Sequence, residues 1–199
     1  MTQAPASRTS RYWDDRFSEP GLAYGESPNE FLRTSCRNLA PGDALSLCEG
    51  EGRNAVYLAK RGFRVTAVDF SRVGLAKAEA LAAKHGVTIT TVFADITDFD
   101  MGVGRWDLVA AIFAQPEGAV RRRLYGQLSQ SLRREGAFIL EAKTGPEAGD
   151  ADRYPGPEIL AGEIAPLKVA FAEEKEQDMH EGRYHSGLLR TVRILAFNR

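Results

Sequence analysis

Cysteine and histidine are scarce in this chain of 199 residues, which has two cysteines, Cys36 and Cys48, and three histidines. Two cysteines are too few for a disulfide framework, and no histidine, cysteine and aspartate residues stand at the spacing of a zinc site. We therefore expect neither a fold that depends on disulfides nor a bound metal.

Long hydrophobic runs are also lacking. The longest run extends from Leu108 to Ala114, whereas a transmembrane helix needs about 20 apolar residues. The N-terminal sequence MTQAPASRTS has no apolar stretch of the kind found in a signal peptide. These absences predict a cytoplasmic protein with no membrane partner.

No charge of one sign predominates, because 26 lysine and arginine residues are matched by 27 aspartate and glutamate residues. Nucleic-acid-binding proteins usually have a marked basic excess, so we expect no nucleic-acid partner. The basic run Arg121–Arg123 is interpreted as a solvated helix face. Hydrophobic residues make up 43% of the chain, and its length fits one globular domain at roughly 150 residues per domain.

Apolar segments alternate with amphipathic ones along the chain. Strands are predicted at 44–48, 63–68, 87–93, 106–113, 137–142, 167–177 and 188–197, and helices at 29–39, 54–61, 71–85, 120–132 and 157–163. The segment 12–24 is aromatic and turn-rich. This order predicts an α/β fold, an open doubly wound, mostly parallel seven-stranded sheet with an antiparallel C-terminal hairpin.

The most informative segment is ALSLCEGEGRNAVYLAKRGFRVTAVDFS, residues 44–71. A strand leads into a glycine turn at Gly50 and Gly52, then a helix, then a strand that ends at Asp69. Glycines let a ligand lie directly against the main chain, and the helix N-terminus offers free N–H groups. A carboxylate at the tip of the neighbouring strand accepts hydrogen bonds from ribose hydroxyls. The pattern predicts a nucleoside cofactor.

Three details favour S-adenosylmethionine over a dinucleotide. The turn lacks the GxGxxG spacing. Glu49 and Glu51 would repel a pyrophosphate but suit the ammonium and sulfonium groups of S-adenosylmethionine. Asp95, at the end of the third strand, is placed to accept from the adenine amino group, with the backbone N–H of Ile96 beside it.

At these residues the sequence resembles the class I S-adenosylmethionine-dependent methyltransferases, in particular their tellurite-resistance and thiopurine-methyltransferase-like branch. The segments that carry the resemblance are Trp13–Phe17 with Tyr24–Gly25 and Pro28–Asn29, Glu51–Ala55 with Val68–Ser71, Phe113–Pro116, and Glu181–Gly187. The resemblance implies a Rossmann-like methyltransferase fold over nearly the whole chain.

The resemblance also implies roles for single positions. The implied cofactor-binding set is Glu49, Gly50, Gly52, Asn54, Asp69, Phe70, Asp95, Ile96, Ala111 and Phe113. Gly50 and Gly52 would back the methionine moiety, Asp69 would hold the ribose, and Ala111–Ala114 would lie under the sulfonium. The usual acid of the first strand is Ser46 here, and the usual first glycine is Cys48. Glu49 either replaces the missing acid or is solvated.

We therefore predict methyl transfer from S-adenosylmethionine to a small-molecule nucleophile. His185 and Tyr184 are the catalytic candidates, with Glu141 as a further candidate base. Residues 1–28 are predicted as a lid, 44–142 as the cofactor-binding core, and 157–199 as the hairpin and acceptor side of a single domain.

Two other functions stay open from the sequence, a nicotinamide-dependent oxidoreductase and a non-catalytic S-adenosylmethionine-binding protein. Structural roles also stay open for three residues: Asp69 and Asp95 as caps of the following turns, and Trp13 as an anchor of the N-terminal segment. We expect a monomer or a homodimer.

Overall fold

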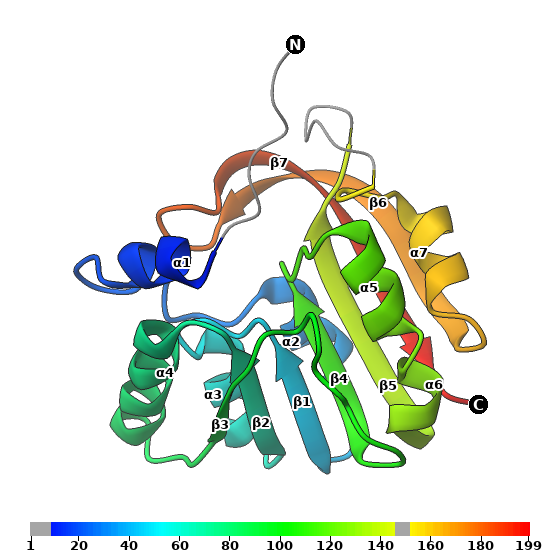
Figure 1. Ribbon diagram of the computed structural model, residues 1–199, viewed down its shortest axis with the longest axis horizontal. Helices are drawn as coiled ribbons and strands as arrows, with labels where there is room; N and C mark the ends of the chain where they lie inside the picture. The colour runs from blue at the N-terminus through cyan, green and yellow to red at the C-terminus, as the bar shows by residue number, and fades with distance from the viewer. Residues whose placement is uncertain (1–8, 146–151) are drawn as a thin grey trace.

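The computed structural model describes residues 9–145 and 152–199. It contains a seven-stranded sheet of order β3-β2-β1-β4-β5-β7-β6. Neighbouring strands from β3 to β5 are parallel, and β7 is antiparallel to both β5 and β6. Figure 1 shows this open sheet with helices on both faces. The predicted α/β fold, a mostly parallel Rossmann-like sheet with an antiparallel C-terminal hairpin, is confirmed.

The strands are β1 Asp43–Leu47, β2 Arg64–Asp69, β3 Thr90–Phe93, β4 Trp106–Ile112, β5 Leu132–Lys143, β6 Lys168–His180 and β7 Ser186–Phe197. The helices are α1 Ser10–Phe17, α2 Glu30–Ser35, α3 Arg53–Lys60, α4 Arg72–Lys84, α5 Gly118–Tyr125, α6 Leu128–Ser131 and α7 Pro157–Glu163. Within the described part of the chain, no helix has the length and apolarity needed to cross a membrane.

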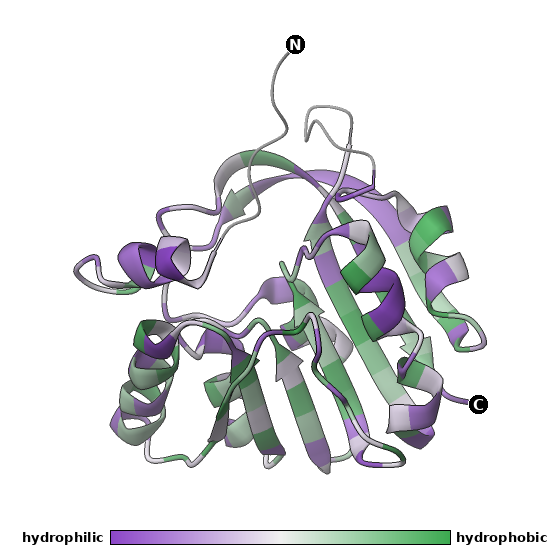
Figure 2. Cartoon of the chain, viewed as in Figure 1, coloured by the Kyte–Doolittle hydropathy of each residue, from purple (hydrophilic) through white to green (hydrophobic). Residues whose placement is uncertain are grey.

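The core lies on both faces of the sheet, as the side chains of β4 show. Val109 and Ala111 belong to the apolar cluster that includes side chains of α5, α6 and α7. Leu108 and Ala110 belong to the cluster that includes side chains of α2 and α3. All four are fully buried, which explains why β4 reads as one continuous apolar run. The apolar strands appear green in the centre of Figure 2.

The predicted helix 120–132 is wrong at its C-terminal end. The chain forms α5 and α6 and then enters β5 at Leu132. Leu132 pairs with Trp106 of β4, and its carbonyl oxygen accepts a hydrogen bond from the Asn198 side chain. Both partners are distant in sequence, so local helical periodicity did not indicate the break.

Three further predictions need correction. The stretch 12–24 contains a helix, α1, whose N-cap Thr9 accepts from the Tyr12 N–H. The strand 87–93 shortens to β3, because the N–H of Val87 donates to Ala82 O and closes α4. Cys48 leaves β1 in the left-handed region, with φ 52°.

The basic run on α5 is not wholly solvated. Arg122 and Arg123 are exposed, but only 3% of Arg121 is exposed. The Arg121 guanidinium pairs with Glu163 at 2.7 Å and so joins α5 to α7.

Candidate functional site

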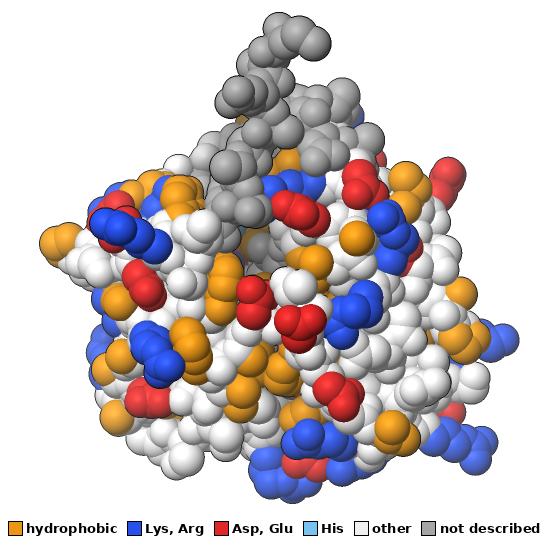
Figure 3. Space-filling view, in the orientation of Figure 1, with side chains coloured by type: hydrophobic (Ala, Val, Ile, Leu, Met, Phe, Trp, Pro, Cys, Tyr) orange, Lys and Arg blue, Asp and Glu red, His pale blue; other side chains and the backbone are white. Residues whose placement is uncertain are grey.

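A cavity of about 820 Å³ lies at the carboxyl ends of β1, β2, β3 and β4. Its walls include Cys48 after β1, Asp69 at the end of β2, Ala94 after β3 and Phe113 after β4. Figure 3 shows a hollow on this face with acidic side chains near its edge. Open α/β sheets bind their ligands at this edge.

The glycine turn forms one wall of the cavity. Gly50 and Gly52 have φ of 65° and 94°, which side-chain-bearing residues rarely adopt. A Cβ on Gly52 would lie 2.6 Å from Ala78 Cα, so only glycine lets α3 begin this close to α4. At Gly50 the Phe17 ring of α1 lies 3.0 Å from the Cβ position. The main chain at Gly50 therefore lines the cavity and is bounded on one side by Phe17. Gly52 does not line the cavity and packs against α4, so the expectation that it backs the methionine moiety is not supported.

The Asp69 carboxylate points at this turn. Its Oδ2 accepts from the Gly50 N–H at 2.9 Å and its Oδ1 accepts from the Ser71 N–H at 2.8 Å. Burial raises the pKa of Asp69, although these backbone donors act in the opposite direction. The residue is therefore both a cap of the next turn and a wall of the cavity, which combines the two interpretations left open by the sequence.

Glu49 is buried, so the interpretation that it is solvated is wrong. Its Oε1 accepts from the N–H groups of Asn54 and Ala55 at 3.0 and 2.9 Å, and its Oε2 accepts from the Ser46 hydroxyl. Burial raises the pKa of Glu49 above its ordinary value. The carboxylate thus caps α3, lines the cavity, and is hydrogen-bonded to the serine that stands at the position of the missing acid.

Glu51 and Asn54 also line the cavity, but their side chains hold the N-terminal segment. Glu51 accepts from the Ala23 N–H at 2.7 Å and pairs with Lys77 at 3.0 Å. The Asn54 side-chain oxygen accepts from the Asn29 N–H at 2.9 Å. The suggestion that Glu51 faces a ligand ammonium is therefore not supported, because its carboxylate is already paired with a lysine.

The residues predicted around the adenine and the sulfonium are only partly brought together. Phe70, Asp95, Ile96 and Phe113 line the cavity, whereas Ala111 does not. Ala111 is fully buried in the core, because strand alternation turns its side chain toward the layer of α5. Asp95 is exposed, and one carboxylate oxygen accepts from the Thr97 N–H at 2.8 Å.

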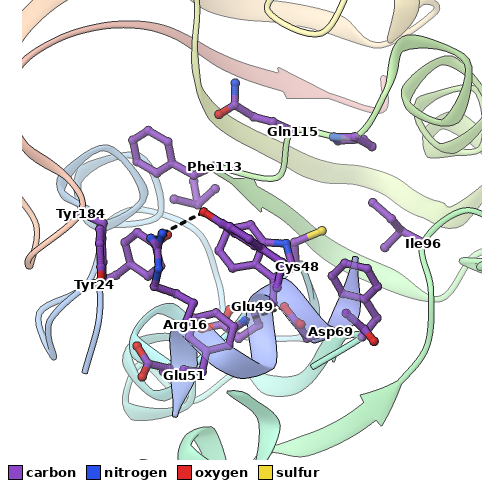
Figure 4. A pocket seen from close by; sticks show the side chains of 18 of the residues that line it. Arg16, Tyr24, Cys48, Glu49, Glu51, Asp69, Ile96, Phe113, Gln115 and Tyr184 are labelled. Atoms are coloured by element: carbon purple, nitrogen blue, oxygen red, sulfur yellow. Dashed lines mark hydrogen bonds between the residues drawn. The ribbon is translucent and has the colours of Figure 1, made fainter. Parts of the chain in front are cut away.

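The two catalytic candidates lie at the end of the cavity away from Asp69 and Ile96, where Figure 4 places Tyr184. The buried His185 ring lies between Phe113 and Tyr24, with centroid distances of 3.9 and 4.6 Å. The Tyr184 hydroxyl donates to the Glu19 carboxylate at 2.6 Å, and this hydrogen bond raises the pKa of Tyr184. A raised pKa makes a tyrosine a poorer base at neutral pH.

Glu141 does not line the cavity and is fully buried. Its carboxylate accepts from Asn29, Gln177, Thr191 and Arg193, at distances of 2.6 to 3.1 Å. The suggestion that Glu141 is a base is therefore wrong, because its carboxylate lies outside the cavity and its oxygens accept hydrogen bonds from four protein side chains.

Sequence reasoning missed Arg16, which lines the cavity from α1. Its segment was recognised by the motif WDDRF, but no local pattern indicates which side chains of that motif face a ligand. Within residues 9–145 and 152–199, no group of three or more His, Cys, Asp or Glu residues is arranged to hold a metal ion.

Comparison with known proteins shows similarity to methyltransferases over part of the chain. Residues 44–136 match the model of a methyltransferase domain. A 2-heptyl-1-hydroxyquinolin-4(1H)-one methyltransferase of Mycobacteroides abscessus is 30% identical over 93 residues, which are 46% of this chain and 41% of that protein. The ribosomal protein L11 methyltransferase of Thermus thermophilus is 32% identical over 111 residues, 53% of this chain and 43% of that protein. The chain thus spans less than half the length of these curated relatives.

Solved structures share the fold at low sequence identity. The N-methyltransferase NodS from Bradyrhizobium japonicum WM9, in complex with S-adenosylhomocysteine, superposes with a TM-score of 0.74 at 14% identity, covering 96% of this chain and 99% of that one. TehB from Haemophilus influenzae gives a TM-score of 0.73 at 14% identity, covering 96% and 67%. The solved structures show that the chain has the Rossmann-like fold of these methyltransferases, and the family match adds that residues 44–136 resemble a methyltransferase domain. The matched segment runs from β1 into β5 and contains the glycine turn, Asp69 and Asp95.

Proposed function

We propose that this chain transfers a methyl group from S-adenosylmethionine to a small-molecule nucleophile. One observation supports this most strongly: a single cavity extends from the Gly50 turn and Asp69 to a group of aromatic side chains. This group, called the acceptor chamber below, consists of Trp13, Tyr24, Phe113 and Tyr184. A cavity of about 820 Å³ falls within the range of pockets that bury small ligands, roughly 300–1,000 Å³.

The donor groups of the cavity fit this cofactor. We propose that the main chain at Gly50 lies against its methionine part and that Asp69 accepts from its ribose. A carboxylate oxygen has two acceptor sites, so Asp69 can bind hydroxyls and still hold its two backbone N–H groups. Phe70 would cover one adenine face. The Asp95 carboxylate would accept a hydrogen bond from the adenine amino group, and the Ile96 N–H would donate one to a ring nitrogen of the adenine.

We propose a separate role for each of three segments of the chain. Residues 44–142 hold the cofactor, and residues 157–199 provide the hairpin and the acceptor side. Residues 1–28 act as a lid, of which residues 1–8 lie outside the described part. Trp13 and Tyr24 from this segment line the cavity, so the segment excludes water from the reacting groups.

Bound S-adenosylmethionine supplies an electrophilic methyl group on a cationic sulfur. The chain's own residues align the acceptor with that methyl group, and the loss of the sulfonium charge favours a dry site. A base is needed only where the acceptor keeps its proton at neutral pH. Of the two candidates we propose His185 for this role, since the Tyr184 hydroxyl is committed to Glu19.

His185→Gln tests that role through the choice of acceptor. We expect the turnover of a hydroxyl acceptor to fall by about 100-fold, within the usual range for general-base catalysis. The turnover of a thiol that ionises near neutral pH should change little. Equal losses for both acceptors would show that His185 acts only by packing between Phe113 and Tyr24.

The resemblance to the tellurite-resistance and thiopurine-methyltransferase-like branch supports thiols and chalcogen oxyanions as acceptors. The test is calorimetry with S-adenosylmethionine and S-adenosylhomocysteine, followed by methylation assays with a panel of thiols, tellurite and selenite. We expect binding of both cofactor forms and methylation of at least one acceptor class. Failure to bind either form would refute the proposal, and binding without any methylation would favour a non-catalytic cofactor-binding protein.

A further inference from the structure

Arg16 is held in the cavity by neutral partners. Its guanidinium donates to the Tyr12 hydroxyl at 2.8 Å and to the Tyr24 hydroxyl at 3.5 Å. The guanidinium carbon lies 3.5 Å from the centroid of the Tyr184 ring. No ion pair joins Arg16 to a carboxylate among residues 9–145 and 152–199.

Two carboxylates that contact this part of the molecule pair with other cations. Glu19 pairs with Arg183 at 2.7 Å and also accepts from Tyr184. Glu51 pairs with Lys77 at 3.0 Å. Arg16 therefore keeps an uncompensated positive charge that faces the cavity. An arginine stays protonated at any physiological pH, so this charge is permanent.

The position of Arg16 along the cavity is also defined. It lies beside Tyr24 and Tyr184, and Asp69 and Ile96 lie at the other end of the close-up view in Figure 4. The next residue, Phe17, packs its ring against Gly50. Arg16 thus stands where the glycine turn meets the acceptor chamber, away from the end assigned to adenine.

From this geometry we infer that Arg16 binds the anionic group of a molecule in the cavity, a carboxylate or a group of similar shape. A guanidinium has five N–H donors in a planar fork that matches a carboxylate. Among the residues that the structure describes, its hydrogen bonds go to two tyrosine hydroxyls, those of Tyr12 and Tyr24. The inference rests on the proposed function, which offers two sources of that anion: the methionine carboxylate of the cofactor and an acidic group on the acceptor.

The first arm of the test measures cofactor binding. Calorimetry compares S-adenosylhomocysteine with its decarboxylated analogue on the wild type, Arg16→Gln and the control Arg11→Gln, an exposed arginine of the same helix. If the partner is the cofactor carboxylate, Arg16→Gln weakens S-adenosylhomocysteine about 10- to 100-fold, the usual range for a hydrogen bond to a charged group. The analogue then binds equally well to both proteins, and Arg11→Gln behaves as wild type.

The second arm measures the acceptor. It compares the KM of thiosalicylate with that of thiophenol, two aromatic thiols that differ by one carboxylate. If the partner is an acceptor anion, Arg16→Gln raises the KM of thiosalicylate about tenfold or more and leaves that of thiophenol unchanged. Arg16→Lys, which keeps the charge but loses the fork, should recover part of either effect.

Two outcomes overturn the inference. One is an Arg16→Gln protein that behaves as wild type in both arms. The other is an equal loss for ligands with and without the carboxylate, which would show that Arg16 only supports α1. A wild type that does not bind S-adenosylhomocysteine refutes instead the proposed function, so the two failures are distinguishable.

Discussion

At the scale of single residues, the buried carboxylate of Glu49 gives the most direct prediction about cofactor binding. It is buried, caps α3 through Asn54 and Ala55, and is hydrogen-bonded to Ser46. We propose that this carboxylate takes the place of the acid missing at Ser46 and faces the ammonium group of the cofactor. A buried carboxylate that gains a cationic partner recovers part of its desolvation cost.

Glu49→Gln should therefore lower the affinity for S-adenosylmethionine by more than about tenfold. The amide oxygen still accepts from the α3 backbone, so the fold is preserved. Burial raises the pKa of Glu49 above 4.5, and a cation binds the ionised form. The affinity of the wild type should accordingly rise as pH increases through that raised pKa, whereas that of the variant should not.

Calorimetry between pH 5 and 8 measures both effects, with Ser46→Ala as a control that keeps the carboxylate. A Glu49→Gln protein with wild-type affinity at every pH would assign Glu49 to helix capping alone.

At the scale of elements, α1 is docked on α4. Asp14 accepts from the Ser71 hydroxyl at 2.5 Å, at the start of α4, while Trp13 stacks on Phe17 within α1 with centroids 5.6 Å apart. Lys77 of α4 donates to the carbonyl oxygens of Glu19 and Gly21. The helix is therefore fixed over the glycine turn by contacts to α4 rather than by its own eight residues, which are too few for independent stability.

Trp13→Ala should expose the acceptor end of the cavity to water. We expect kcat to fall about tenfold or more, because the displacement requires a dry site, while the affinity for S-adenosylhomocysteine changes less than about threefold. Steady-state kinetics and calorimetry measure the two quantities, with Arg11→Ala as the control on the exposed side of α1. An equal loss of affinity would make Trp13 part of the cofactor site instead of the lid.

At the scale of the whole molecule, one buried charge network connects segments from both ends of the chain. Glu141 in β5 is fully buried, and it binds Asn29 before α2, Gln177 in β6, and Arg193 in β7. The Asn29 side chain also donates to Glu181, which pairs with Arg53 at the start of α3 at 2.7 Å. These hydrogen bonds and this ion pair therefore connect the C-terminal hairpin to the N-terminus of α3, which follows the glycine turn.

Glu141→Ala should lower the free energy of unfolding by about 3–5 kcal/mol, because the buried Arg193 guanidinium loses the closer of its two carboxylate partners and keeps only Glu173 at 3.3 Å. Urea denaturation measures the change. Glu135→Ala, which removes the exposed pair with Arg199, should cost about 0–1 kcal/mol. Similar costs for the two variants would contradict the structural role of the Glu141 network.

Cofactor binding should also stabilise the whole molecule. At a concentration 100 times its Kd, S-adenosylhomocysteine should add about 2.7 kcal/mol and raise Tm by roughly 5–10 °C. Differential scanning fluorimetry measures the shift, with NADH as the comparison. A shift with NADH but not with S-adenosylhomocysteine would favour the oxidoreductase alternative.

The order of strands and helices and the glycine turn with Asp69 could be predicted from the sequence, because each depends on residues close together in the chain. Hydrophobic periodicity defines an element within a few residues, and parallel strands bring the ends of β1 and β2 to one edge. The tertiary structure alone decided where α1 lies, that Glu141 is structural, and that Arg16 faces the cavity. Those contacts join residues as far apart as Glu19 and Tyr184, 165 positions along the chain, and only packing of the complete sheet brings such partners together.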